Sequence, residues 1–239
     1  MIALAVLLLS FMLTISAYAA GTLETLVDNI FGADTQTIDI VILLTLLTLL
    51  PSLLIMLTGF TRIVIVLSFI RNALGLQNVP PNQVIIGLAL FITFFVMSPV
   101  FTQIYDEAYI PYSNEEITQD EFLDRAMDPI RGFMLKQTYK SDLEFFVGLS
   151  GESPDTPEDT PNSTLIPAFM TSEIKRAFQI GFFIYIPFVV MDMVVSSTLM
   201  AMGMMMLPPS MISLPFKVLL FVLVDGWQLI IGELIQGFA

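Results

Sequence analysis

The sequence predicts an all-α membrane protein with about four long, kinked apolar helices and a periplasmic segment of short helices. Two observations lead to this class. Hydrophobic residues make up 56% of the 239 residues and charged residues only 13%, whereas soluble domains contain about 25% charged residues. The apolar residues are also gathered into runs long enough to cross a bilayer core of about 30 Å.

Four apolar blocks account for the predicted helices. They lie at 40–61, 84–105, 177–207 and 215–238. The first two contain no charge, whereas the last two contain Asp192, Lys217, Asp225 and Glu233. Four spans is therefore the simple hydropathy interpretation. Prolines inside and beside the blocks predict kinks, and neighbouring protein must satisfy the backbone groups that a kink frees in lipid.

Polar stretches divide the chain into parts. Residues 1–19 are expected to form a signal peptide, because an apolar run ends in the small-x-small pattern Ala-Tyr-Ala; an uncleaved helix is the alternative. Residues 20–39 form a polar N-terminal segment. Residues 40–105 hold a first pair of apolar helices, residues 106–176 an acidic segment, and residues 177–239 a second pair with a Met-rich end.

Charge distribution predicts the orientation in the membrane. Residues 106–165 contain 14 acidic and four basic residues. The connection between the first two blocks contains Arg62 and Arg71 and no acid, which predicts a cytoplasmic location by the positive-inside rule. The acidic segment and both termini then lie in the periplasm. The net charge of −13, without a basic patch, gives no support for nucleic-acid binding.

Local patterns predict helix starts within the acidic segment. Thr118 and Glu121 have the spacing of a capping box, in which a hydroxyl and a carboxylate satisfy the first backbone N–H groups of a helix. Ser141 and Glu144 have the same spacing. Asp128 followed by a proline predicts a further helix start.

The residue types leave little room for enzymatic chemistry. The chain contains no cysteine and no histidine, which excludes thiol chemistry and histidine-dependent acid–base or metal chemistry. No cofactor or metal is expected. Asp192 and Asp225 remain, and they could form an intramembrane protease dyad, a proton relay or structural ion pairs with Lys217, Arg62 or a partner subunit. The protease is the weakest of these, because Asp225 lacks the Gly-x-Gly-Asp setting.

The end of the third block is rich in methionine. Met200, Met202 and the run Met204, Met205 and Met206 precede two prolines. Unbranched thioether side chains adapt to irregular and changing surfaces. Packing in lipid or in a core is one interpretation of this pattern. The other is a deformable apolar seal in a pore, because hydrophobic constrictions can close channels.

Long motifs in the chain resemble the flagellar branch of the FliP/SctR family of type III secretion export-gate subunits. The resemblance covers about residues 38–233. The matching motifs are FTRIVIVL (60–67), RNALG (71–75), PPNQV (80–84), GLALF (87–91), FFVMSPV (94–100), PAF (167–169), AFQIG (177–181), MMM (204–206), PP (208–209), LPFK (214–217) and FVLVDGW (221–227).

The resemblance implies a function, partners and a place in the cell. It implies a core subunit of the flagellar protein export gate, not an enzyme, in the bacterial inner membrane and the flagellar basal body. Several copies would assemble with FliQ and FliR into a helical pore complex, with FlhB associated and FliO assisting assembly. Unfolded flagellar subunits would pass through it. The family's methionine gasket would fall on Met204, Met205 and Met206. Independently of the resemblance, the intramembrane charges Asp192, Lys217 and Asp225 are expected to serve subunit pairing.

Overall fold

The computed structural model describes residues 45, 48–49, 52–151, 153–204 and 206–238. The helices belong to the compact unit that begins at Leu54. The expected signal peptide and the polar segment at 20–39 lie outside the described residues, as do residues 40–44, 46–47 and 50–51 of the first apolar block. The regular structure of the described residues is helical and includes no strand, which confirms the all-α class.

Helices of very different lengths follow one another in this unit. In chain order they are α3 (Phe60–Ala73), α4 (Asn82–Ile104), the π-helical turn η1 (Tyr105–Tyr109), α5 (Ile110–Ser113), α6 (Gln119–Gln137), α7 (Lys140–Ser150), the 3₁₀ turn η2 (Pro157–Asp159), α8 (Asn162–Ala201), α9 (Pro209–Leu223) and α10 (Gly226–Gln236).

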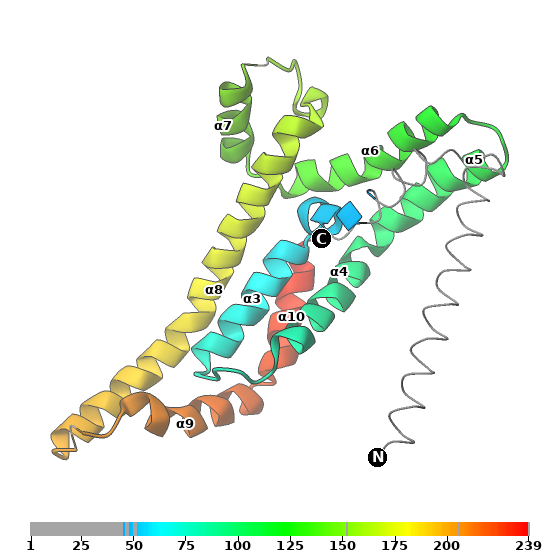
Figure 1. Cartoon of the computed structure of the whole chain (residues 1–239). Coiled ribbons are helices and arrows are strands. Elements are labelled where there is room, and N and C mark those ends of the chain that lie inside the picture. The colour runs from blue at the N-terminus through cyan, green and yellow to red at the C-terminus, as the bar shows by residue number, and fades with distance from the viewer. Residues whose placement is uncertain (1–44, 46–47, 50–51, 152, 205, 239) are drawn as a thin grey trace, which may run out of the picture. The chain divides into compact units, whose positions relative to one another are not determined.

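The short helix α3 lies between the longer helices α4 and α8 and packs against both (Figure 1). Ile63, Leu67 and Ile70 recur at helical spacing on α3, and each is at most 1% exposed. Together with Ile92 of α4 and Phe188 of α8 they form the main hydrophobic core. The core is therefore organised around α3, although α3 is among the shorter apolar helices.

Fewer helices than predicted have the length and composition of a membrane span. Among the described residues, the run 82–113, in which α4 continues through η1 and α5, and the helix α8 meet that description. The pair α9 and α10 would count as a third only if a helix bent by 62° is one span. The second block is confirmed as a helix, whereas the count of four spans is not confirmed.

The fourth apolar block is two helices, not one. α9 begins before the block, at Pro209, and ends at Leu223. Asp225 then adopts the left-handed conformation, with φ 50° and ψ 47°, which aspartate tolerates better than most residues. A Cβ on Gly226 would lie 2.4 Å from the Phe221 ring. The dipeptide therefore allows a sharp bend with close packing across it.

The third block belongs to a helix that begins much earlier. α8 starts at Asn162 and runs for 40 residues, so the boundary expected between residues 176 and 177 lies inside one helix. Much of its apolar surface is uncovered: Phe178, Phe182 and Phe183 are 56%, 64% and 69% exposed. An exposed apolar surface of this kind is typical of contact with lipid or another protein.

The helix starts expected in the acidic segment have mixed outcomes. Thr118 forms the predicted capping box with Glu121 at the start of α6. Pro129 does not start a helix, because α6 has begun at that box and continues through it. Ser141 does not cap α7 either. That helix starts one residue earlier, where the Tyr139 backbone N–H donates to Ser172 of α8.

The helix that contains the third block ends before the last methionines of that block. α8 ends at Ala201, and Gly203 follows with a positive φ of 76°. A glycine in this conformation is a common helix terminator. Met204 and Met206 therefore lie in the non-helical connection between α8 and α9, where Met206 is 99% exposed. Met205 lies outside the described residues.

Candidate functional site

A buried arginine joins distant parts of the chain. Arg62 lies in the first turn of α3 and is 1% exposed. Its Nε donates to Glu173 Oε2 at 3.0 Å, and its Nη2 donates to the other carboxylate oxygen. Nη2 also donates to Gln137 Oε1 at 3.0 Å, and Nη1 to the Gly237 carbonyl at 3.1 Å.

Burial of this charge is tolerated because each part of the guanidinium group has a partner. A buried ion is costly unless it is paired and its remaining hydrogen-bonding groups are satisfied. The guanidinium carbon also lies 3.9 Å from the centre of the Phe238 ring, a cation–π geometry. Gln137 closes the arrangement by donating from Nε2 to the Phe238 carbonyl at 3.1 Å. We call Arg62, Glu173, Gln137, Gly237 and Phe238 the arginine cluster.

The arginine cluster contradicts the expected place of Arg62 in a cytoplasmic connection. Arg62 is inside a helix and contacts Glu173, which the charge pattern assigns to the periplasmic segment. Two residues in contact cannot lie on opposite sides of a membrane. Arg62 is therefore a packing residue and gives no evidence about the orientation in the membrane. Arg71, near the other end of α3, still supports the predicted orientation.

A second polar group extends the arginine cluster along α8. Arg176 donates from Nη1 to Gln137 Oε1 at 3.1 Å, and its guanidinium carbon lies 4.5 Å from the centre of the Tyr139 ring. Tyr139 in turn donates from its hydroxyl to Gln179 Oε1 at 3.1 Å. Tyr139, the residue that precedes α7, is thus held against α8 through both its ring and its hydroxyl.

Asp142 of α7 forms a third polar contact with α8. Ser172 Oγ donates to Asp142 Oδ2 at 2.8 Å, and Lys175 Nζ donates to Oδ1 at 2.9 Å. Partial burial acts to raise the pKa of Asp142, but the hydrogen bonds from Lys175 and Ser172 outweigh it and hold the pKa below its ordinary value. Asp142 is therefore a carboxylate that stabilises the fold in its charged form.

The other end of the helix bundle has its own ion pair, in which the lysine is buried and the aspartate is partly exposed. Lys217 of α9 is 5% exposed, and its Nζ donates to Asp192 Oδ2 at 2.6 Å and to the Ala73 carbonyl at 3.2 Å. Ser213 Oγ donates to the second Asp192 oxygen, Oδ1. Because Ala73 is the last residue of α3, the lysine also meets the negative end of a helix dipole. This pair links α3, α8 and α9.

The structure brings together two of the three predicted intramembrane charges. Asp192 and Lys217 pair within the chain. Asp225 does not join them and is exposed at the bend between α9 and α10. Met204 and Met206 lie in the connection after α8, and neither belongs to the arginine cluster. The pairing of Arg62 with Glu173 was not expected from the sequence, in which Lys175 and Arg176 are the nearest basic residues to Glu173.

The arrangement is that of a structural scaffold. The described residues contain no group of three carboxylates placed to hold a metal ion. The side chains of Arg62, Glu173, Arg176, Asp142, Lys175, Asp192 and Lys217 are used in contacts between helices. The fold therefore defines a helical membrane protein whose apolar helices are joined by buried polar clusters and whose exposed apolar surface is available to lipid or partners.

Comparison with known proteins identifies the family. The FliP family model matches residues 43–234, and the chain belongs to the FliP family. A flagellar biosynthetic protein FliP of Pectobacterium carotovorum subsp. carotovorum is 56% identical over 206 residues, which cover 85% of this chain and 80% of the relative. The protein of that name from Bacillus subtilis (strain 168) is 53% identical, with 88% and 98% covered. That from Aquifex aeolicus (strain VF5) is 48% identical, with 85% and 86% covered.

Removing one member of the buried ion pair should be much worse than removing both. We expect Arg62→Met to lower the free energy of unfolding by about 3–5 kcal/mol, because Glu173 is left buried without a cation. Arg62→Met combined with Glu173→Met should recover most of this loss, because apolar side chains of similar size replace the pair. Thermal unfolding in a mild detergent measures both effects.

The control for this prediction is an exposed ion pair. Lys140 and Glu144 of α7 are 88% and 66% exposed, and Lys140→Met should cost no more than about 1 kcal/mol. Equal losses in the single and the double variant would contradict the assignment of Glu173 as the partner of Arg62.

Acid should weaken the contact between α7 and α8. Because the folded-state pKa of Asp142 is lowered, the stability that it contributes is complete above its unfolded pKa of about 3.8 and is lost as pH falls through the folded value. We expect the Tm of the protein to fall more steeply below pH 4 than the Tm of Asp142→Asn. Asp155→Asn, a change of an exposed loop acid, is the control, and parallel curves for Asp142→Asn and the unchanged protein would contradict the prediction.

Proposed function

We propose that this chain is a core subunit of the flagellar type III protein export gate. In this proposal several copies form, with FliQ and FliR, the channel through which unfolded flagellar subunits cross the bacterial inner membrane. FlhB would associate with the complex, and FliO would assist its assembly within the flagellar basal body. The observation that carries the proposal is the match of the FliP family to residues 43–234.

The exposed apolar surface supports an assembled state. In the window of 18 residues that makes α8 a candidate span, 11% of the residues are buried. The corresponding window of the run 82–113 is 33% buried. Since the described residues leave most of both windows uncovered, neighbouring subunits can pack on these helices without disturbing the core around α3. The role is that of a passive channel subunit, with energy supplied elsewhere in the machinery.

We assign the pore seal to Met204, Met205 and Met206. The described members of this run lie after the last residue of α8, in the connection to α9, where the Met204 N–H donates to the Leu199 carbonyl. Flexible thioether side chains from several copies could pack together to exclude ions and repack around a passing polypeptide. The seal would then be tight at rest and deformable in use.

A proton- or solute-coupled transporter is the alternative that Asp192 and Asp225 suggested. Asp192 is engaged by Lys217 and Ser213, which favours a structural role for it. Asp225 lies at the bend of the last two helices and does not contact that pair. Asp225 is therefore the member of the three intramembrane charges that remains for pairing with another subunit.

The composition of the assembled complex tests the proposed function. Co-expression with FliQ and FliR, followed by native mass spectrometry in a gentle detergent, should give a discrete hetero-oligomer with several copies of this chain. Expression of this chain with an unrelated membrane protein of similar size is the control. A lone monomer or dimer with no stable partner would contradict the proposal.

The methionine run should be needed for a tight resting gate. Replacing Met204, Met205 and Met206 together by alanine shortens the side chains that close the pore, and we expect several-fold faster leakage of small ions across the membrane. Ion conductance of proteoliposomes that contain the whole complex measures this. Met200→Ala with Met202→Ala, which are also exposed, is the matched control. A triple variant that assembles and stays as ion-tight as the unchanged complex would exclude this seal.

A further inference from the structure

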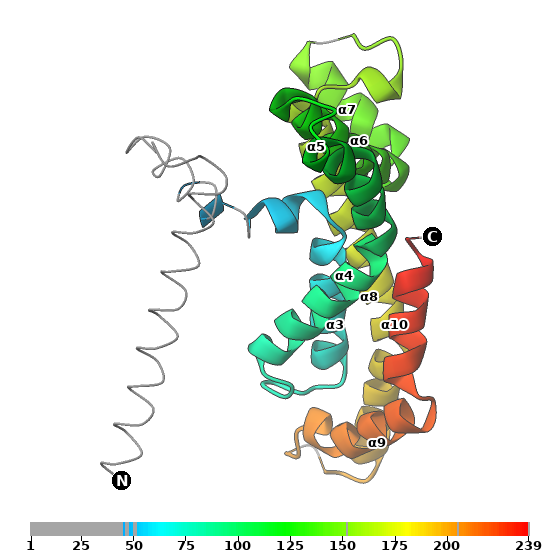
Figure 2. The ribbon, with the colours of Figure 1, turned by 90° about the vertical axis from the view of Figure 1, so that its right-hand side faces the viewer.

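Methionines are concentrated where α8 ends. Met200, Met202 and Met204 alternate along this stretch, and they are 60%, 68% and 38% exposed. Two views of the fold place the end of α8 beside α9, away from α6 and α7 (Figure 1 and Figure 2). The proposed pore seal uses Met204 but gives no role to Met200 or Met202.

The backbone folds Met204 back onto the last turn of α8. The Met204 N–H donates to the Leu199 carbonyl at 3.0 Å. The Gly203 N–H donates to the Met200 carbonyl, also at 3.0 Å, and Gly203 has a positive φ of 76°. These two bonds define a Schellman motif, a tight turn that ends many helices. Met200 and Met204 therefore lie within one turn of chain, with Met202 between them.

This turn allows the three sulfur atoms to approach one another. A methionine side chain is unbranched and has three rotatable bonds, so its sulfur can point toward a neighbour in the same turn. The three side chains are exposed, and moving them does not disturb the core. The end of α8 can thus direct several thioethers to one point on the surface.

The chemistry of these ligands favours a soft monovalent cation. Thioether sulfur selects Cu(I), whereas Ca²⁺ and Mg²⁺ prefer oxygen ligands. Neutral ligands also leave less charge uncompensated around a monovalent ion than around a divalent one. Harder ligands are scarce here, because residues 193–224 contain no acidic residue and the chain contains no cysteine or histidine. Asp192, the nearest acid before this stretch, is held by Lys217 and Ser213.

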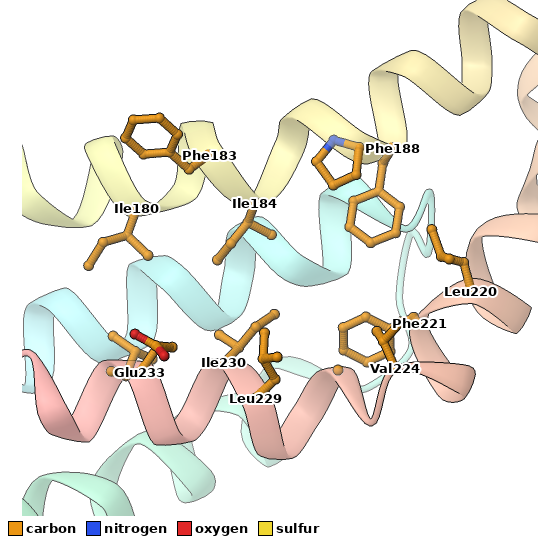
Figure 3. A pocket seen from close by; sticks show the side chains of 13 residues that line it. Ile180, Phe183, Ile184, Phe188, Leu220, Phe221, Val224, Leu229, Ile230 and Glu233 are labelled. Atoms are coloured by element: carbon orange, nitrogen blue, oxygen red, sulfur yellow. The ribbon is translucent and has the colours of Figure 1, made fainter.

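Apolar packing alone does not account for the choice of methionine. The groove between α8 and the last two helices is also apolar, and Figure 3 shows Ile184, Phe188 and Ile230 among the side chains in its walls. None of the described residues that line it is a methionine. Five of the fifteen methionines of the chain instead fall within residues 200–206.

We propose that the end of α8 binds one soft monovalent cation, Cu(I) or Ag(I), through the sulfur atoms of Met200 and Met204, with Met202 as a further ligand. A bound ion would tie the connection after α8 to the helix and restrict the movement of Met204. The inference goes beyond the proposed function, because a single copy of the chain carries the whole site.

Calorimetric titration of the purified full chain with silver nitrate, in a mild detergent and a chloride-free buffer, tests the inference. We expect saturable binding of one Ag(I) per chain. Met200→Leu combined with Met204→Leu keeps apolar side chains and removes both sulfur atoms, so it should weaken binding at least tenfold. The matched control is Met56→Leu combined with Met193→Leu, which changes methionines that are 41% and 65% exposed and should leave binding unchanged.

X-ray absorption at the silver edge gives a second measurement, on the unchanged chain, that does not depend on the folding of any variant. We expect sulfur neighbours around the bound ion. A shell of oxygen atoms alone, competition by Ca²⁺, no saturable binding, or equal affinities in the two double variants would each overturn the inference. Any of these results with an intact hetero-oligomer would leave the export-gate proposal standing.

Discussion

Arg62 and Glu173 are 111 residues apart in the sequence and meet where α3, α6, α8 and the end of α10 converge. The cost of burying either charge alone exceeds that of most single contacts in the core. The pair is therefore a constraint on the geometry: α3 can lie against α8 only in the register that brings the two charges together. The arginine cluster and the Lys217–Asp192 pair act near opposite ends of α3, and between them the apolar core is free to pack without polar neighbours.

Because these polar contacts fix how the helices pack within the chain, the outer surfaces of the helices can remain apolar. In a membrane, lipid is as apolar as a leucine side chain, so packing of apolar faces alone does not strongly select one partner. Polar contacts supply the selection inside this chain.

The parts predictable from the sequence are those set by neighbours along the chain. Apolar composition predicted α4, and the capping box at Thr118 predicted the start of α6. The bend at Asp225 was missed, although Asp-Gly is a recognised turn signal, because the surrounding apolar run dominates a hydropathy average. The Arg62–Glu173 pair was not predictable from local pattern. In the sequence each residue resembles a charge in an exposed loop, and only the tertiary structure shows that it is buried.

The separation within the arginine cluster has a consequence for biosynthesis. Chains are synthesised at about 5–20 residues per second, so Glu173 emerges on the order of 10 s after Arg62. During that interval α3 carries an unneutralised cation and has no α8 to pack against. The nascent protein must spend this time with Arg62 solvated at the membrane surface or in the insertion machinery. The charge of Arg62 stabilises the finished fold. Until Glu173 is synthesised, the same charge delays insertion of the first helices into the bilayer.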